Sequence, residues 1–485
     1  MNNKSIKINA FLNGLRSVLN LIFPLITFPY VSRILSVNGI GIYNFSSTFV
    51  GYFVLIAGLG INTYAVREGA KYRDNSKQIA TFSNQLFSIN IISTILAYVL
   101  LFVTIFAFPK LNNYISCILV FSIQIFFTTI GTEWIYTIYE DYTYITIRSI
   151  LFKIFSILLL FLFVKRQSDY LIYAGITVLA SVGSNLLNFI HARSFISLKL
   201  TTKIDWKRHL KPILIIFSSA IAVNIYVYSD NTILGIMKDE YAVGIYSIAV
   251  KIYTIAQSLL TAILTVTIPR LAFLYGKKLI EEYNYLLHRV IDTLLILALP
   301  ASTGLIMLSK PIVMLIASRK YMNSVSSLSI IAFAIIFSIF SWIFSDCVLI
   351  PAKRESLVFH CTLITAVFNV VVNIILIPFF SYNATALCTV LSELLSMILN
   401  GYFCRDIIGP VIFNSSTLKN IFDSAIGCCF IVFVCFVTNI FIINYIFKIA
   451  ISVIMSILSY TLVLILLKNK VILSLILGFK YKAKM

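Results

Sequence analysis

Long apolar runs constrain the fold of this chain more than any other feature of its sequence. Runs of about 20 apolar residues recur along its 485 residues, and a helix of that length crosses the ~30 Å hydrocarbon layer of a bilayer. Because no water reaches this layer, each run must satisfy its own backbone hydrogen bonds, and a helix does so. Only 12% of the residues are charged, against roughly 25% in soluble domains. The sequence therefore predicts an all-α, polytopic membrane protein.

About fourteen transmembrane helices follow from the apolar runs between charged or turn-rich segments. The first run contains Arg16 and two prolines and is not followed by a small-residue cleavage site. We therefore interpret it as a retained helix and not as a signal peptide. The predicted limits of the spans are 8–30, 40–64, 81–108, 113–138, 145–165, 170–192, 212–236, 242–269, 287–309, 324–350, 356–378, 384–404, 421–442 and 446–467.

A repeat groups these spans. The segments "NGIGIYNF" (Asn38–Phe45) and "YAVGIYSI" (Tyr241–Ile248) each enter a span and stand 203 residues apart, and in both the shared tyrosine precedes an arginine at the inner end by 24 residues. This shared register predicts two pseudo-symmetric six-helix lobes around a central cavity, followed by a C-terminal helix pair. The predicted parts are an N-terminal lobe at 1–196, a cytoplasmic basic linker at 197–211, a C-terminal lobe at 212–406, appended helices at 421–467 and a basic cytoplasmic tail at 468–485.

The positive charges are distributed unevenly around the spans. With the N-terminus inside, 26 of the 38 Lys and Arg residues lie on the cytoplasmic side and nine on the other, and three fall inside spans. Lys and Arg are enriched in cytoplasmic loops, so both termini are predicted to be cytoplasmic. The net charge of +20 is then explained by topology and attraction to anionic lipid, without a nucleic-acid partner.

Five charged residues are predicted deep inside spans, where insertion costs about 2.5–3.5 kcal/mol and a charged group usually faces a cavity or a partner. These residues are candidates for a mildly cationic cavity that binds an anionic, phosphate-bearing ligand. The cavity interpretation is best supported for Lys251, which lies deep in its span. Arg16 could instead reach the inner interface with its long side chain. For Lys153 the cavity and the interface interpretations both stay open. The set comprises Arg16, Lys153, Lys251, Asp230 and Glu393.

Two prolines, Pro24 and Pro29, fall in the outer half of the first predicted helix. Each removes a backbone hydrogen bond, and a membrane helix tolerates this only where its freed carbonyl finds another partner. The pair predicts a bent helix, which is either a gating hinge or a static kink. We interpret most of four other prolines as markers of helix ends: Pro269, Pro300, Pro351 and Pro378.

Motifs for enzyme chemistry are missing from the sequence. The eight cysteines lie mostly inside apolar runs without a C-x-x-C spacing, and only four histidines occur, so neither a metal site nor a disulfide framework is predicted. There is no phosphate-binding glycine loop and no H-E-x-x-H. The sequence thus predicts a transporter without catalytic residues or a cofactor, driven by a gradient or membrane potential, with Na⁺ or H⁺ as a coupling ion.

The stretch "PLITFPYVSRILSVNGIGIYNFSSTFVGYFVLIAGLGINTYAVREGAK" (Pro24–Lys71) resembles the first helical hairpin of the Wzx-type polysaccharide flippases. These belong to the multidrug/oligosaccharidyl-lipid/polysaccharide exporter superfamily. Three later segments are similar to the same family, and the resemblance covers about 400 residues. They are "YEDYTYITIRSILFKI" (Tyr139–Ile154), "SDNTILGIMKDEYAVGIYSIAVKIY" (Ser229–Tyr253) and "TIPRLAFLYGK" (Thr267–Lys277).

The resemblance implies a fourteen-helix, V-shaped fold in a bacterial plasma membrane. It also implies that the protein moves undecaprenyl-pyrophosphate-linked polysaccharide repeat units from the inner to the outer leaflet by alternating access, for capsule, O-antigen or a related surface polysaccharide. Membrane lipids, a polysaccharide polymerase and other assembly proteins are the partners it implies. Basic cavity residues meet the pyrophosphate in such flippases, and Arg16 and Lys251 occupy helices where this role is expected.

Three other functions stay open from the sequence. A MATE-like drug/cation antiporter would favour an acidic and apolar cavity, whereas the deep set here is slightly basic. A membrane polysaccharide polymerase or glycosyltransferase would usually have a long outer loop, and the longest predicted outer loop is only about fifteen residues. A non-transporting scaffold of a cell-wall assembly machine is the third.

Overall fold

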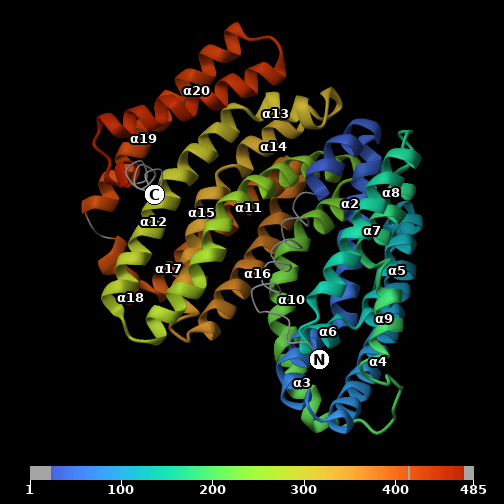
Figure 1. Ribbon diagram of the computed structural model, residues 1–485. Helices are drawn as coiled ribbons and strands as arrows, with labels where there is room; N and C mark the ends of the chain where they lie inside the picture. The colour runs from blue at the N-terminus through green and yellow to red at the C-terminus, as the bar shows by residue number, and fades with distance from the viewer. Residues whose placement is uncertain (1–22, 413–414, 475–485) are drawn as a thin grey trace. The chain divides into compact units, whose positions relative to one another are not determined.

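The computed structural model describes residues 23–412 and 415–474 of the chain (Figure 1). Within this part the regular structure is helical and contains no strand, and thirteen helical segments are long and apolar enough to cross a membrane. These thirteen match the predicted spans after the first in order, with limits that differ by between zero and eight residues, and the predicted fold class is confirmed. The chain is a multi-pass membrane protein. The first predicted span lies mostly outside the described residues, although 23–34 is helical.

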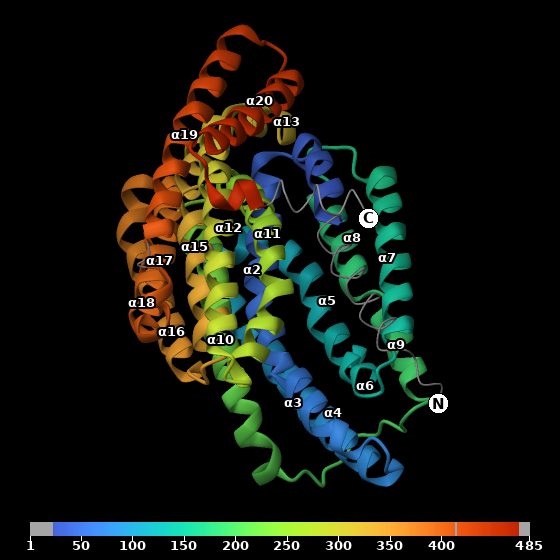
Figure 2. The same ribbon diagram turned by 60° about the vertical axis from the view of Figure 1, so that its left-hand side comes forward.

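The first of two compact units runs from Met1 to Gly244. Its central helix is α2, which packs against α4, α5, α8 and α10; Figures 1 and 2 show these helices side by side. The unit contains α2 (Val37–Gly58), α3 (Ile61–Gly69), η1 (Ala70–Tyr72), α4 (Ser76–Ala107), η2 (Pro109–Tyr114), α5 (Ile115–Gly131), α6 (Glu133–Ile138), α7 (Tyr142–Phe163), α8 (Tyr170–Val182), α9 (Asn185–Ala192), α10 (Trp206–Met237) and the first turn of α11 (Glu240–Gly276).

The second unit runs from Ile245 to Met485. Helix α17 packs against α14, α15 and α16, while α12 packs against α15 and α19. The predicted appended pair, α19 and α20, is therefore tied to the unit through α12 and α13. Besides the rest of α11, the unit contains α12 (Ile280–Met307), α13 (Ser309–Ile316), η3 (Arg319–Tyr321), α14 (Ser324–Ile331), α15 (Ala334–Trp342), the π-helix η4 (Ile343–Leu349), α16 (Glu355–Phe380), α17 (Tyr382–Phe403), α18 (Arg405–Ile412), α19 (Ser415–Phe441) and α20 (Tyr445–Leu466).

The contact-based units and the repeat-based lobes divide the chain at different places. Helix α10 packs on α2 in the first unit, whereas the repeat assigns the segment 212–236 to the second lobe. A compact unit reflects which helices touch, while a repeat reflects which segments correspond, so the two divisions need not coincide. The predicted lobes, the linker at 197–211 and their limits stay a prediction.

A pair of glycines brings α2 against the first turn of α11. A Cβ on Gly41 would overlap the carbonyl oxygen of Glu240, and a Cβ on Gly244 would overlap the carbonyl oxygen of Val37. The two helix starts therefore touch backbone to backbone, as small residues permit in membranes. The two contacts are related by the repeat. Gly244 stands 203 residues after Gly41, and Glu240 stands 203 residues after Val37, which is the offset that aligns the two repeat segments.

The span that contains α2 is broken inside its length. Leu59 and Gly60 both have left-handed backbone conformations, with φ of 46° and 71°, and separate α2 from α3. The carbonyl of Ala57, next to this break, accepts hydrogen bonds from Asn90 Nδ2 and Ser93 Oγ of α4, both at 2.6 Å. Irregular backbone at membrane depth persists only where such partners exist, so α4 stabilises the break.

The prolines behave differently from the interpretation based on sequence. Pro269 and Pro300 lie inside α11 and α12, seven residues before the helix ends, so the interpretation that most of the four prolines mark helix ends is wrong for these two. Pro300 cannot donate to the carbonyl of Ile296, and the Tyr460 hydroxyl of α20 donates to that carbonyl at 2.8 Å. A partner from a distant helix thus allows α12 to continue. The hinge at Pro24 and Pro29 stays a prediction.

Candidate functional site

The predicted charged residues are divided between the two units. Arg16 lies outside the described residues. Lys153 of α7 and Asp230 of α10 belong to the first unit and are both half-buried. Lys251 of α11, also half-buried, and Glu393 of α17, which is 7% exposed, belong to the second. A cavity shared by this set stays a prediction.

Lys251 is the best-defined cation of the set. It lies eleven residues after the first residue of α11, about 16 Å along the helix axis, and its neighbours are Val250 and Ile252. Its side chain makes no hydrogen bond or ion pair with any residue that the structure describes. An ammonium at this depth needs water or an anionic ligand as its partner.

Glu393 does not supply that partner. The α11 tyrosines Tyr246 and Tyr253 lie seven residues apart, so they share one face of the helix, and Tyr246 meets Thr389 of α17 through a 3.0 Å hydroxyl contact. Lys251 is about 150° around the helix from these tyrosines and thus away from α17, which carries Glu393. The predicted acid and base therefore lie on different sides of α11.

Aromatic and hydroxyl groups meet between α2 and α10 in a set that we call the α2–α10 cluster: Tyr52, Tyr228 and Thr232. Asp230 is two residues from both Tyr228 and Thr232, so it projects about 160° around α10 from them and is not part of the cluster. The rings of Tyr52 and Tyr228 meet edge to face with centroids 5.4 Å apart. The Thr232 hydroxyl donates to the Tyr52 hydroxyl at 3.4 Å. Gly51 makes room for this arrangement, since a Cβ there would lie 2.8 Å from the Tyr228 ring.

The α2–α10 cluster has the chemistry of a binding surface and not of a catalytic centre. It offers aromatic rings and hydroxyls, without an activated nucleophile or a base oriented by a third group. Tyr52 and Thr232 were missed by the sequence because no motif links Tyr52 to α10. Only the packing of two helices distant in sequence brings them together.

The first unit also contains a buried arginine. Arg148 of α7 is 5% exposed, and its guanidinium is 3.6 Å from the Glu133 carboxylate of α6. The same guanidinium lies over the Tyr144 ring, which in turn stacks on His191 with centroids 4.0 Å apart. The cluster ties α6, α7 and α9 together, so it holds the helix ends and has its charge balanced locally.

Metal-ion chemistry finds no support in the described part of the chain. No group of three His, Cys, Asp or Glu residues there is arranged to hold a metal. All eight cysteines are in the described residues and are free thiols. Two separate candidates therefore stand, one in each unit: the α2–α10 cluster in the first and Lys251 in the second.

Two curated relatives share sequence with this chain, each with the name "Putative O-antigen transporter". The protein from Escherichia coli (strain K12) is 25% identical over 255 residues, which is 52% of this chain and 61% of the relative, less than two thirds of its length. The protein from Shigella dysenteriae is 24% identical over 390 residues, covering 78% of this chain and 94% of the relative.

Two solved structures have a similar fold. The lipid II flippase MurJ, in an inward closed conformation, matches with a TM-score of 0.74 and 16% identity over 95% of this chain and 100% of that chain. An inward-facing multidrug resistance MATE family transporter of the MOP superfamily matches with a TM-score of 0.61 and 14% identity, over 81% and 95%. The sequence profile described as "Polysaccharide biosynthesis protein" matches residues 6–274, which is more than half of the chain. The protein belongs to this polysaccharide biosynthesis protein family.

Proposed function

We propose that this protein is a flippase that moves undecaprenyl-pyrophosphate-linked polysaccharide repeat units from the inner to the outer leaflet of a bacterial plasma membrane. Its family membership supports a role in polysaccharide biosynthesis, and both curated relatives are named as transporters of O-antigen. The fold it shares with a lipid II flippase suits a lipid-linked substrate. Capsule, O-antigen and related polysaccharides are the products we consider.

The observation that carries this proposal is the position of Lys251. An ammonium that has no partner among the described residues at membrane depth is unfavourable until an anion approaches it. A pyrophosphate head group needs charge-assisted hydrogen bonds before it leaves water, so each group compensates the other. Arg16 would supply a second cation in the same role.

The sugar part of the substrate needs different contacts. Sugars present hydroxyl groups and flat apolar faces, which hydroxyl, carboxylate and aromatic side chains can bind. The α2–α10 cluster offers two of these within one surface: the two tyrosine rings and the Thr232 hydroxyl. Asp230, on another side of α10, is a separate candidate. We propose the cluster as a contact site for the repeat unit during alternating access.

The remaining elements of the proposal concern energy, partners and orientation. Na⁺ or H⁺ would be the coupling ion, and membrane lipids, a polysaccharide polymerase and other assembly proteins would be the partners. Both termini would be cytoplasmic, as the distribution of Lys and Arg predicts. Pro24 and Pro29 would form the hinge of an outer gate.

The experiment is deletion of the gene followed by complementation with variants. Deletion should stop surface polysaccharide and cause an undecaprenyl-linked repeat unit to accumulate on the inner leaflet. Wild type and Lys251→Arg should restore export, because the charge is kept. Lys251→Ala should reduce export at least tenfold while the protein still inserts. Lys277→Ala, which removes an exposed lysine after α11, is the matched control and should restore export fully.

Two outcomes contradict different parts of the proposal. If Lys251→Ala exports as well as wild type, Lys251 does not bind the substrate, and the flippase function stands on the lipid analysis alone. If deletion causes no lipid-linked repeat unit to accumulate, the function itself is wrong.

A MATE-like drug/cation antiporter is the second candidate, because the fold also resembles a MATE transporter, with a TM-score of 0.61. A cation carrier should lose transport when Asp230 or Glu393 is neutralised and should tolerate Lys251→Ala. Export of a cationic dye from proteoliposomes tests this directly. A membrane polymerase or glycosyltransferase is disfavoured by the names of the relatives, which are transporters.

A further inference from the structure

The start of α10 has two faces with different roles. On one face His209 is fully buried, with its ring nitrogens bonded to Tyr64 Oη at 2.9 Å and Gln85 Oε1 at 2.7 Å. Ile213 lies on the same face and is also buried. These contacts fix the rotation of the helix on α3 and α4, so the opposite face must point outward.

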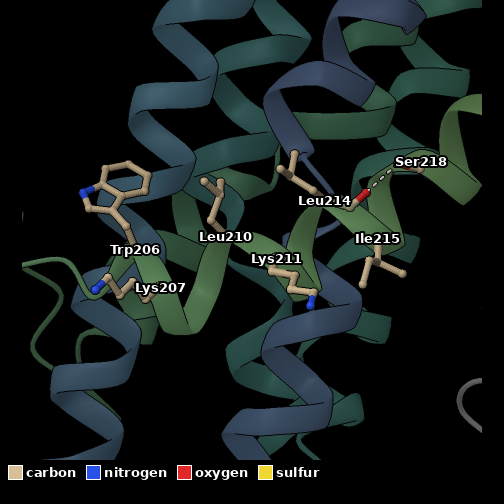
Figure 3. Close-up of a pocket in the computed structure, with 7 residues that line it drawn as sticks. All are labelled: Trp206, Lys207, Leu210, Lys211, Leu214, Ile215 and Ser218. Atoms are coloured by element: carbon tan, nitrogen blue, oxygen red, sulfur yellow. Dashed lines mark hydrogen bonds between the residues drawn. The ribbon is translucent and has the colours of Figure 1, made fainter.

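The outward face carries two lysines followed by apolar side chains. Lys207 and Lys211 are exposed, and they stand one helical turn apart on the side opposite His209. Leu214 and Ile215 follow in the next turn and are 42% and 61% exposed. Figure 3 shows these side chains on successive turns of one helix. Together with Trp206 they line an open hollow of about 440 Å³.

The lysines have no acidic partner within the structure. Neither side-chain ammonium makes an ion pair or a hydrogen bond with a described residue, and the nearby Asp205 carboxylate instead accepts from the backbone N–H of Arg208 at 3.1 Å. Two neighbouring cations without a counter-charge attract an anion, and the attraction is strongest beside an apolar surface of low dielectric.

The order of groups along the helix selects the kind of anion. From the lysines the face passes directly into the apolar part of a membrane span, and only 11% of that span's most apolar window is buried, the smallest share among the thirteen described spans. A ligand that matches must carry a negative head and an apolar tail. Trp206 precedes Lys207 and lies at the polar end of this face, and indoles are enriched at the level of the head groups.

We propose that this face of α10, defined by Trp206, Lys207, Lys211, Leu214 and Ile215, is a binding site for an anionic glycerophospholipid of the surrounding membrane. The lipid phosphate lies between Lys207 and Lys211, and an acyl chain lies along Leu214 and Ile215. The indole of Trp206 lies beside the head group, at the polar end of the site. The site is independent of the transported substrate, because it uses neither Lys251 nor the α2–α10 cluster.

The test measures which lipid lies next to Trp206. The full chain is reconstituted into phosphatidylcholine bilayers that contain a small fraction of phosphatidylglycerol or phosphatidylcholine brominated on its acyl chains, and tryptophan quenching is recorded. Subtraction of the signal of Trp206→Phe isolates the contribution of this indole. Brominated phosphatidylglycerol should quench Trp206 at about tenfold lower bulk fraction than brominated phosphatidylcholine, since each lysine near a membrane surface attracts anionic lipid.

Substitutions then locate the preference. Lys207→Gln combined with Lys211→Gln should abolish the difference between the two lipids, and about 0.5 M salt should weaken it in wild type by screening. Lys199→Gln combined with Lys203→Gln removes the same charge from the neighbouring basic loop and should leave the preference intact. Because all four side chains are exposed, the folded state should be kept, which thermal unfolding checks.

Three results would overturn the proposal. Equal quenching of Trp206 by both lipids in wild type means that no anionic lipid is selected. Loss of the preference in the Lys199 and Lys203 variant means that the general field of the basic loop, and not this face, attracts the lipid. Displacement of brominated phosphatidylglycerol by far smaller amounts of undecaprenyl pyrophosphate means that the occupant is the transported lipid.

Discussion

The contact of α2 with α11 in the first unit and the contact of α12 with α19 in the second are built in opposite ways. The first uses glycine backbone: Gly41 and Gly244 each lie where a Cβ would overlap the other helix. The second uses buried polar side chains. Asp292 of α12 is 3.2 Å from His288 and accepts from the Thr417 hydroxyl of α19 at 3.2 Å.

The polar contact continues beyond α20. The side-chain amide of Asn469 donates to Asn420 at 2.8 Å and to Asp423 at 2.9 Å, and Asp423 is only 2% exposed. Lipid is as apolar as the side chains of the helices, so membrane helices associate through close packing or through hydrogen bonds. The two regions each use one of these solutions. Substitutions at the glycine contact should therefore destabilise the protein through steric overlap. Substitutions at the polar contact should destabilise it through the loss of individual hydrogen bonds.

Substitution of the glycine pair should have the largest effect. Gly41→Ala or Gly244→Ala places a methyl group on a backbone carbonyl oxygen that cannot move without separating the helices, and we expect about 3 kcal/mol or more of destabilisation. Thermal unfolding of the purified protein measures this. Gly175→Ala in α8, where a Cβ meets nothing within 4 Å, should be neutral or slightly stabilising. Equal stability of all three variants would show that the close contact at Gly41 and Gly244 does not contribute to stability.

Substitution in the polar network should reduce the stability of the protein by an intermediate amount. Asn469→Ala removes the amide that donates to Asp423, and leaving a buried acceptor without its partner costs about 1–3 kcal/mol. The unfolding midpoint should fall, while the exposed Asn112→Ala should leave it unchanged. A midpoint equal to that of wild type would show that the network holds α19 no better than packing alone.

The hydrogen bond between the Tyr460 hydroxyl and the Ile296 carbonyl gives a sharper test, because its contribution to stability depends on Pro300. Tyr460→Phe should cost about 1 kcal/mol in the natural background. In a Pro300→Ala background the new N–H can donate to the same carbonyl, so the same substitution should cost less. A double-mutant cycle on thermal unfolding measures this coupling. Additive effects would mean that the hydroxyl does not replace the bond that the proline removes.

The smallest effect is expected at an exposed ion pair in the second unit. The Arg354 guanidinium bonds both Asp406 oxygens, at 2.8 and 2.6 Å, and this bond lowers the pKa of the Asp406 carboxyl. The pair therefore contributes above the unfolded-state pKa, near 4, and loses its contribution as pH falls through the lower folded-state pKa. Since Asp406 is 53% exposed, we expect less than about 1 kcal/mol.

Comparison of wild type with Asp406→Asn across pH measures that contribution. Wild type should unfold at a slightly higher temperature at pH 7, and the two proteins should converge below about pH 4. A difference that grew at acidic pH would reverse the sign of the argument. A difference as large as that of Asn469→Ala would contradict the contrast between buried and exposed polar contacts.

The sequence by itself determined the membrane class, the order of the spans and most of their limits. This follows from the physics of the bilayer, which requires each span to be apolar over about 20 residues and helical, so the signal is local. The segment 170–192, for example, is the span that the structure has. The depth of Lys251 along its helix was readable for the same reason.

Only the tertiary structure decided which groups meet. That Tyr460 satisfies the carbonyl freed by Pro300, that Tyr52 lies against Tyr228, and that Lys251 faces away from the helix of Glu393 all depend on how helices distant in the chain pack. The same holds for the two faces of α10, where the bonds of His209 leave the lysines outward. Hydrophobicity is nearly uniform around membrane helices, so their rotation is fixed by such specific contacts and leaves no periodic signal in the sequence.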